Sequence, residues 1–307
     1  MQQQIMNFIS KLLLLFGLLF AVDYSVGLIY GDISDLVLEK APNASRTDYT
    51  MKRVNAEILI MGASRASHHY VSSLISDSLN KTVFNCGLDG QPFSYSVAMI
   101  YAVLQRYTPE TIIVDIAPQM LASDFSFGNL TELYPHYSEA EFYKNLIIHE
   151  DSNHRYKMTS RMYRYNSKLI KVLRSFFLPD YIQENGYSAL ASKGYKYPHL
   201  HTVEYDTNLP VDNFKVNLLM SCIKLCKASD VNLMFVVSPR YQHSNIRQVS
   251  AYLTLKDILM KNNVPLIDLG ENTMINDSTM YKDAAHLNHK GALEFTNFFL
   301  NRIKDME

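Results

Sequence analysis

Short apolar runs alternate with helix-like segments along most of the chain, and this alternation constrains the fold more than any other feature. The runs are apolar throughout, as expected of strands that are buried on both faces, whereas half-exposed strands alternate apolar and polar residues. Strands separated by helices form parallel sheets. The sequence therefore predicts an α/β protein in which helices cover both faces of a central parallel sheet. We expect the strands at residues 57–61, 81–85, 111–116, 231–237 and 264–269, and the helices at 66–79, 93–107, 211–228, 246–262 and 291–304.

Residues 119–210 interrupt the alternation and are rich in Tyr, His and Asn. A structureless loop of that length is unusual in a compact domain. We therefore interpret this region as a helical insertion or lid within an α/β domain of residues 55–307, with helices at 139–148 and 160–177.

The first thirty residues form a separate hydrophobic segment, followed by a polar linker at residues 31–54. The uncharged apolar run of Leu12 to Val22 is too short to span a bilayer alone, but residues 5–30 are long enough if Lys11 and Asp23 lie near the membrane surface. We interpret residues 1–30 as an uncleaved signal anchor. A cleaved signal peptide and a buried amphipathic helix are the alternatives. Either export interpretation places the rest of the chain outside the cytoplasm.

Charge and cysteine content exclude some partners and sites. The formal net charge is -1, so no global field favours nucleic acid. Cys86, Cys222 and Cys226 lack a histidine at zinc-ligand spacing and are interpreted as small buried residues. We expect no metal site. The 21 tyrosines suit half-wet surfaces such as sugar-binding clefts.

Polar residues follow several predicted strands, so they should meet at the carboxyl edge of the sheet, where open α/β sheets bind ligands. Ser64 lies at the turn after the first strand. There its hydroxyl can act as a nucleophile, and its N–H, near a helix N-terminus, can face a developing oxyanion. Gly87 follows the second strand, and its N–H is a second predicted oxyanion donor. A helix cap at Ser64 and a plain turn at Gly87 are the alternatives.

The segment before the last predicted helix reads Asp283-Ala-Ala-His286-Leu-Asn288. In a hydrolase triad, a histidine accepts the serine proton through one nitrogen while a carboxylate holds the other nitrogen. A spacing of three residues in a tight loop lets Asp283 reach the ring of His286. The sequence thus predicts a catalytic triad of Ser64, Asp283 and His286. The alternative is a helix-entry loop in which Asn288 or Asp283 caps the final helix.

Together these segments resemble the SGNH (GDSL-like) hydrolase superfamily over about residues 55–118 and 210–305. The Gly62-Ala-Ser64 turn is similar to the family's nucleophile block, Asn85-Cys-Gly87 to its glycine block, and Asp283 to Asn288 to its terminal D-x-x-H-L-N block. The resemblance implies a flavodoxin-like three-layer α/β/α fold and ester chemistry without a metal or organic cofactor. The stretch from Gly62 to Tyr70 is similar to exported, anchored members of bacterial envelope and polysaccharide pathways.

The chain departs from the family pattern at two places. Ala63 and Arg65 stand where the common version has Asp and a small or polar residue. The usual G-x-N-D block after the third strand is missing, and Asp115-Ile-Ala-Pro-Gln119 occupies its place. The family's Asn oxyanion donor therefore has no direct counterpart. Five residues near the crevice are candidate substrate contacts, of which Gln119 could also replace the missing donor: Arg65, Asp89, Gln91, Gln119 and Arg240.

These features predict an extracytoplasmic serine esterase or O-acyltransferase that acts on ester-linked acyl groups of an envelope or exported polysaccharide, or on a small acyl ester. We expect contact with the membrane through the N-terminal helix, and a membrane acyltransferase as a partner. The alternative is a catalytically inactive SGNH-fold protein that binds or assembles polysaccharide. A flavodoxin-like nucleotide-binding domain is disfavoured because no Gly-rich phosphate loop follows the first strand.

Overall fold

The computed structural model describes residues 1–40, 45–125, 128–165, 168, 170, 174, 184–191, 201–270 and 277–305. They belong to two compact units. The helical unit comprises Met1–Ser45 and Leu130–Tyr181, and the α/β unit comprises Arg46–Asn129 and Ile182–Glu307. All the residues predicted to carry chemistry lie in the α/β unit.

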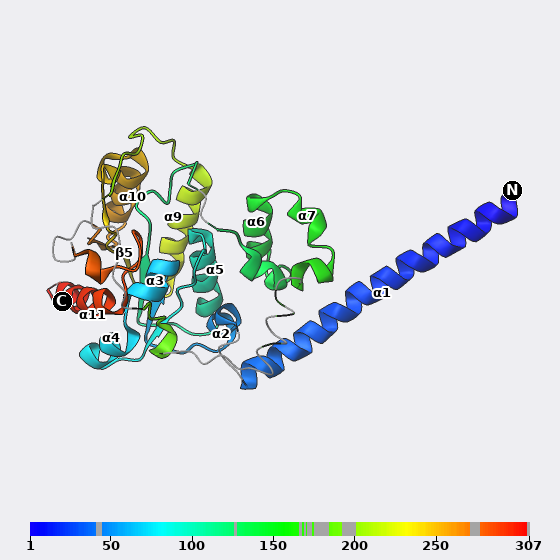
Figure 1. Cartoon of the computed structure of the whole chain (residues 1–307), viewed down its shortest axis with the longest axis horizontal. Coiled ribbons are helices and arrows are strands. Elements are labelled where there is room, and N and C mark those ends of the chain that lie inside the picture. Colours follow the sequence, from blue (N-terminus) through cyan, green and yellow to red (C-terminus); the bar gives the residue numbers. More distant parts are fainter. Residues whose placement is uncertain are drawn as a thin grey trace. The chain divides into compact units, whose positions relative to one another are not determined.

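Five parallel strands form the central sheet of the α/β unit (Figure 1). Their order is β2-β1-β3-β5-β7, which is the flavodoxin-like order of a doubly wound sheet. The predicted fold class, three layers around a parallel sheet, is thereby confirmed. The strands are β1 Ile58–Met61, β2 Val83–Asn85, β3 Thr111–Asp115, β5 Asn232–Val237 and β7 Leu266–Asp268.

Helices connect these strands in the order that the sequence predicts. Because crossovers between parallel strands are right-handed, the reversal of direction after β2 puts the helices before and after β2 on opposite faces of the sheet. On one face α11 contacts both α3 and α4, and on the other α5 contacts α9. The helices are α2 Arg46–Lys52, α3 Ser64–His69, α4 Ser72–Leu79, α5 Phe93–Leu104, α9 Asn213–Ala228, α10 Ser250–Lys261 and α11 His289–Lys304, with short 3-10 turns η2 Glu184–Gly186, η3 Ile246–Gln248 and η5 Ser278–Met280.

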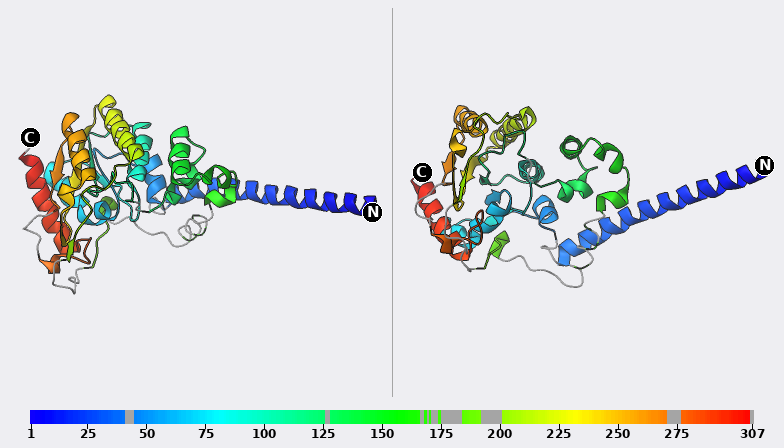
Figure 2. Two further views of the ribbon diagram at one scale, coloured as in Figure 1. Left: turned by 90° about the horizontal axis from the view of Figure 1, so that it is seen from above. Right: turned by 45° about the horizontal axis from the view of Figure 1, so that its top comes forward.

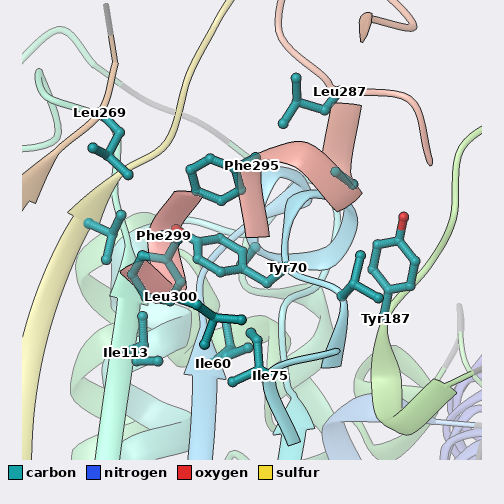
Figure 3. Packing of buried hydrophobic residues seen from close by; sticks show 14 of the residues in the cluster. Ile60, Tyr70, Ile75, Ile113, Tyr187, Leu269, Leu287, Phe295, Phe299 and Leu300 are labelled. Atoms are coloured by element: carbon teal, nitrogen blue, oxygen red, sulfur yellow. The ribbon is translucent and has the colours of Figure 1, made fainter. Parts of the chain in front are cut away.

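Aromatic packing fixes α11 against the sheet (Figure 3). The rings of Phe295 and Phe299 stack at a centroid distance of 6.1 Å, and Tyr70 meets them edge to face at 5.1 and 5.4 Å. Beneath them lie Ile60 of β1 and Ile113 of β3, both almost fully buried. This cluster holds the N-terminal end of α11, and with it the loop that precedes the helix, at the carboxyl edge of the sheet.

The helix predicted at 66–79 is interrupted, and this is a correction. Tyr70 and Val71 adopt extended backbone angles and separate α3 from α4. The Tyr70 hydroxyl donates to Asp115 Oδ2 at 2.8 Å, and the Val71 N–H donates to Thr296 Oγ1 at 3.1 Å. These distant partners compensate for the helical hydrogen bonds that are lost.

Parts of the regions predicted as linker and insertion have regular structure. Residues 31–40 continue α1, and residues 46–52 form α2, which buries Thr47 and Met51. Within 119–210, β4 (His201–Val203) pairs in parallel with β6 (Gln242–Ser244), which gives a second, two-stranded sheet.

The helical unit contains α1 (Gln2–Lys40), a single continuous helix (Figure 2), together with η1 Thr131–His136, α6 Glu141–Glu150 and α7 His154–Lys157. The predicted helix at 139–148 corresponds to α6. Residues 161–165 are helical, and most of the rest of the predicted helix 160–177 lies outside the described residues.

Candidate active site

A glycine-dependent turn places Ser64 directly beyond the end of β1. Gly62 has φ +145°, and a Cβ there would lie 2.7 Å from the backbone oxygen of Asp115. Only glycine fits this turn without strain. Ser64 is the first residue of α3, so its N–H has no acceptor within the helix.

Ser64, His286 and Asp283 are connected by hydrogen bonds, although 222 residues of sequence separate the serine from the histidine. Ser64 Oγ lies 2.6 Å from His286 Nε2. On the other side of the ring, Nδ1 lies 2.9 Å from Asp283 Oδ1 and 3.0 Å from Oδ2. Because a carboxylate faces Nδ1, that nitrogen carries the proton and Nε2 accepts from the serine hydroxyl. This is the geometry that nucleophile activation requires.

Asp283 is held in its ionised form by the loop around it. The backbone N–H groups of Ala285 and His286 donate to Asp283 Oδ1 at 2.8 and 3.0 Å. Burial acts to raise the pKa of Asp283, but these N–H groups and the His286 ring outweigh burial, and the pKa lies below its usual value. The carboxylate is therefore available to orient the ring at neutral pH.

Two buried residues fix the loop that carries His286. The N–H of Leu287 donates to His69 Nε2 at 3.0 Å. Burial, followed by the nearby charge of Arg65, holds the pKa of His69 well below its ordinary value, so His69 is a neutral acceptor. The side chain of Asn288 accepts from the Gly291 N–H at 3.1 Å and caps α11. The loop is therefore a capped helix entry, which was the alternative interpretation of this segment, and it also brings Asp283 to His286.

His68 lies beside His286 but differs from it in protonation, because both of its ring nitrogens face acceptors. Its Nδ1 is 2.6 Å from the carbonyl oxygen of Ser188, and its Nε2 is 3.0 Å from Asp89 Oδ2. Both partners are acceptors, so both ring nitrogens donate and the ring is an imidazolium. Burial lowers the pKa of His68, but the bonds to Asp89 and Ser188 outweigh it and the pKa is raised. The His68 and His286 rings meet edge to face at 5.8 Å.

Arg46 is a residue of this site that sequence reasoning missed. It lies in the segment predicted as a linker, where no motif distinguishes it. Its guanidinium donates to the backbone oxygen of Gly87 at 2.5 Å and to the hydroxyl of Ser188 at 3.1 Å. Arg46 therefore connects the loop after β2 to the segment that holds His68.

Gly87, a predicted oxyanion donor, has an acceptor for its N–H in this structure. Its N–H donates to Asn85 Oδ1 at 2.9 Å, and Asn85 is itself fixed because its amide donates to the Ala66 backbone oxygen at 2.6 Å. A side chain two residues away thus accepts the hydrogen of Gly87, and its role as an oxyanion donor stays a prediction. The N–H of Ser64 is the predicted donor without an assigned acceptor among the described residues.

Arg65, Asp89 and Gln91 occupy different environments near the crevice. The Arg65 guanidinium pairs with Asp115 at 3.2 Å and donates to the Ser238 backbone oxygen at 3.2 Å, so it connects strand ends instead of projecting freely toward substrate. Asp89 binds His68, although its side chain remains 60% exposed. Gln91 is buried, and its Oε1 has no partner among the described residues.

Gln119 and Arg240 lie together in a pocket formed beyond the ends of β3, β5 and β7. No hydrogen bond from Gln119 to the Ser64 turn occurs in the described part of the chain. Gln119 Oε1 is buried and without a partner there. The three cysteines are free and buried, and the described residues contain no cluster of three or more His, Cys, Asp or Glu side chains suited to a metal ion.

Comparisons with known proteins give similar structures at low identity. A psychrotrophic esterase from a Pseudoalteromonas species, inhibited by monoethylphosphonate, has 11% identity and a TM-score of 0.41, with 81% of this chain and 97% of the esterase covered. A protein assigned as an acylhydrolase from Bacteroides fragilis has 11% identity and a TM-score of 0.39, with coverage of 80% and 86%. No protein-family model and no curated protein matches the sequence. The assignment of a function therefore depends on the geometry of the site.

Proposed function

We propose that this chain is a membrane-anchored, extracytoplasmic serine esterase or O-acyltransferase whose substrates are acyl esters of an envelope or exported polysaccharide. One observation supports the chemistry above all others. A serine hydroxyl at a strand-to-helix turn lies 2.6 Å from a histidine whose opposite nitrogen faces an ionised aspartate. This arrangement is suited to covalent acyl transfer.

In the acylation step, His286 Nε2 takes the proton from Ser64 Oγ while that oxygen attacks the carbonyl carbon of the ester. The carbonyl oxygen becomes negative, and the N–H of Ser64 at the start of α3 faces it. Asp283 stabilises the imidazolium that forms. The intermediate then collapses: the carbon–oxygen bond to the alcohol breaks, His286 gives its proton to the leaving oxygen, and the acyl group remains on Ser64.

In the deacylation step, His286 takes a proton from the attacking water or from a hydroxyl group of an acceptor sugar. The new oxygen bonds to the acyl carbon, the bond to Ser64 Oγ breaks, and the proton returns to the serine. With water the products are a carboxylic acid and the free enzyme, and with a sugar hydroxyl the product is an acylated sugar. The same three side chains serve both outcomes.

The length and hydropathy of α1 support membrane anchoring. Gln2–Ile33 is long and apolar enough to cross a membrane, and an 18-residue window within it has a mean hydropathy of 2.2. Residues 2–22, at about 1.5 Å per residue, extend about 30 Å, the thickness of a bilayer's hydrocarbon core. Directly after them, Asp23 accepts hydrogen bonds from Ser160 Oγ at 2.6 Å and from the Arg161 and Met162 N–H groups at 2.9 Å. Asp23 thus caps a second helix at the point where the apolar stretch ends.

The hydrolytic proposal is tested by turnover of an aryl acetate and of an O-acetylated polysaccharide. We expect the wild type to release acetate or to move it to an added oligosaccharide, and Ser64→Ala to do neither. Ser73→Ala on α4 is the matched control and retains turnover. Equal activity in wild type and Ser64→Ala would refute the assignment.

A non-catalytic role is the second candidate, and the occupied Gly87 N–H favours it. Asn85 accepts that hydrogen, and the Asn donor of the resembled family has no counterpart. Loss of one oxyanion donor typically lowers the rate about 10²–10³-fold. If this role is the correct one, the protein binds the polysaccharide, and the wild type turns over neither ester.

A further inference from the structure

A pocket that the triad does not use lies at the same edge of the sheet. It lies beyond the ends of three adjacent strands. Arg240, Gln119, Ser238 and Tyr205 contribute polar groups to its walls. The two-stranded sheet contributes Gln242 and Ser244 of β6, so the pocket has its own supporting structure.

Hydrogen bonds connect the wall of this pocket to the turn that carries Ser64 and to the loop that carries Asp283 and His286. The Ser238 backbone oxygen accepts from Arg65, the neighbour of the nucleophile, at 3.2 Å. The Tyr241 N–H donates to the backbone oxygen of Ala284, between Asp283 and His286, at 3.0 Å. The pocket wall is therefore joined by hydrogen bonds to the turn that carries Ser64 and to the loop that carries His286.

Charge around Arg240 is not balanced within the described residues. Asp115 is almost fully buried and pairs with Arg65, while its second oxygen accepts from Tyr70. Arg240 forms no ion pair in the described part of the chain, and its Nε is buried without a hydrogen-bond partner. Burial, then the nearby charge of Arg65, lowers the pKa of Arg240, and Tyr205 and Asp115 offset this only in part. Arg240 thus lies near the Arg65–Asp115 ion pair without an ion-pair partner of its own in the described part of the chain.

Other polar atoms of the pocket also lack partners. Gln119 Oε1 and Ser238 Oγ are buried and form no hydrogen bond with the described residues. A hydroxyl can donate, and a glutamine amide can present its N–H₂ end after a flip. Buried polar atoms normally have partners, and Arg240 Nε can only donate, so this unpartnered atom indicates a ligand that accepts a hydrogen bond.

From this charge balance we propose that the pocket is a subsite for a single carboxylate on the ester substrate, with Arg240 as its main contact. The proposal depends on the proposed ester chemistry and specifies its substrate class: an ester with a carboxylate on either its acyl or its alcohol part. A guanidinium binds a carboxylate through two parallel N–H donors, which gives orientation as well as affinity. The neighbouring Arg247 is different, because it is already paired with Asp268 at 2.9 Å.

Two pairs of isosteric esters test the proposal and separate the two positions of the carboxylate. Aryl hemisuccinate is compared with aryl succinamate for the acyl part, and 4-carboxyphenyl butyrate with 4-carbamoylphenyl butyrate for the alcohol part. We expect the wild type to prefer the carboxylate in one pair by about 10- to 100-fold in kcat/KM, the range of a hydrogen bond to a charged group. Arg240→Gln removes this preference, and Arg240→Lys restores part of it.

Arg302→Gln is the matched control, because it removes one positive charge from an exposed position on α11 and retains the preference.

A binding measurement covers the case in which no ester is turned over. Calorimetry of butyl hemisuccinate with Ser64→Ala should give binding that Ser64→Ala/Arg240→Gln weakens at least about tenfold. Turnover without any Arg240-dependent preference overturns the subsite alone. Absence of turnover with retained binding refutes the ester chemistry but not the subsite. Absence of Arg240-dependent binding overturns the subsite.

Discussion

At the scale of single residues, the side chain of His286 lies within hydrogen-bonding distance of those of Ser64 and Asp283. His286 is held on one side by a carboxylate with two backbone donors and on the other by the serine hydroxyl. The ring therefore needs no rearrangement to accept the proton. Its orientation depends on Asp283, whose removal would leave either tautomer available.

Asp283→Asn tests this dependence. The amide can donate to His286 Nδ1, which would shift the proton to Nε2 and remove the acceptor that Ser64 needs. We expect kcat for an aryl acetate to fall by roughly 10²–10⁴-fold with little change in stability. Steady-state kinetics combined with a melting curve checks both parts. A variant with unchanged kcat would contradict the role given to Asp283.

The ion pair of His68 with Asp89 gives a pH dependence whose sign follows from the two pKa shifts. The pKa of His68 is raised above 6.5, so its contribution to stability is present below that value and is lost as pH rises through the folded-state pKa. The pKa of Asp89 is lowered from 3.8, so its contribution is present above that value and is lost as pH falls through the folded-state pKa. Arg46, His69 and His286 are the other charged or titratable groups near this pair.

Asp89→Asn should therefore lower the melting temperature most between about pH 4 and 6.5, with a smaller difference between variant and wild type at about pH 8–9. Melting curves measured across this whole range of pH provide the test. A difference that stays constant over the range would show that His68 is not protonated by its contact with Asp89.

The sequence predicted the three residues Ser64, Asp283 and His286, but it did not predict the buried side chains that hold the surrounding loops in place. Ser64, Asp283 and His286 could be predicted because each follows a predicted strand and the last two are close in sequence. Asn85 accepts the Gly87 N–H and His69 accepts the Leu287 N–H. The contact between His69 and Leu287 joins residues that are 218 apart in sequence, and no local sequence pattern predicts it.

At the scale of elements, the turn between β1 and α3 determines where the nucleophile lies. Gly62 must adopt φ +145°, and its Cα faces the backbone of Asp115 at the end of the neighbouring strand. The turn and the strand end are therefore packed too closely for any side chain at position 62.

Gly62→Ala should both destabilise the protein and displace Ser64. The backbone strain alone costs about 1–3 kcal/mol, and the overlap with the Asp115 oxygen adds to it. Gly90→Ala is the matched control, because Gly90 also has positive φ but has open space around its Cα. Denaturant unfolding should show a clearly larger loss for Gly62→Ala. Equal losses in the two variants would mean that steric closeness is not what requires glycine there.

The strands and most helices could be predicted because apolar runs and helical periodicity are local signals. The break between α3 and α4 could not, since Tyr70 and Val71 are ordinary helix residues. Their extended conformation is stabilised by Asp115 and Thr296, and the latter is 225 residues from Val71. The pair β4 and β6 was likewise missed, because each strand is three residues long.

At the scale of the whole molecule, the chain combines an α/β unit with a helical unit that contains α1. Within the helical unit, α1 does more than supply an apolar segment. Tyr30 stacks on Tyr165 at 4.1 Å, and a Cβ at Gly27 would lie 2.4 Å from the Arg161 side chain.

We expect the purified membrane form to retain residues 1–22, because they belong to a helix that is long and apolar enough to cross a membrane. Membranes washed with alkaline carbonate should still contain the protein, and peptide mapping should recover peptides that include Leu12 to Val22. Release by the wash, or an N-terminus near Asp23 in the mature protein, would contradict a retained anchor.

Covalent labelling with a fluorophosphonate tests the reactivity of Ser64 most directly, because the probe reacts only with a serine whose proton a neighbouring base removes. Mass spectrometry of the labelled wild type should find one adduct, on Ser64, with no adduct in Ser64→Ala and much slower labelling in His286→Ala. Absence of an adduct in the folded wild type, or an adduct that persists in Ser64→Ala, would contradict the account.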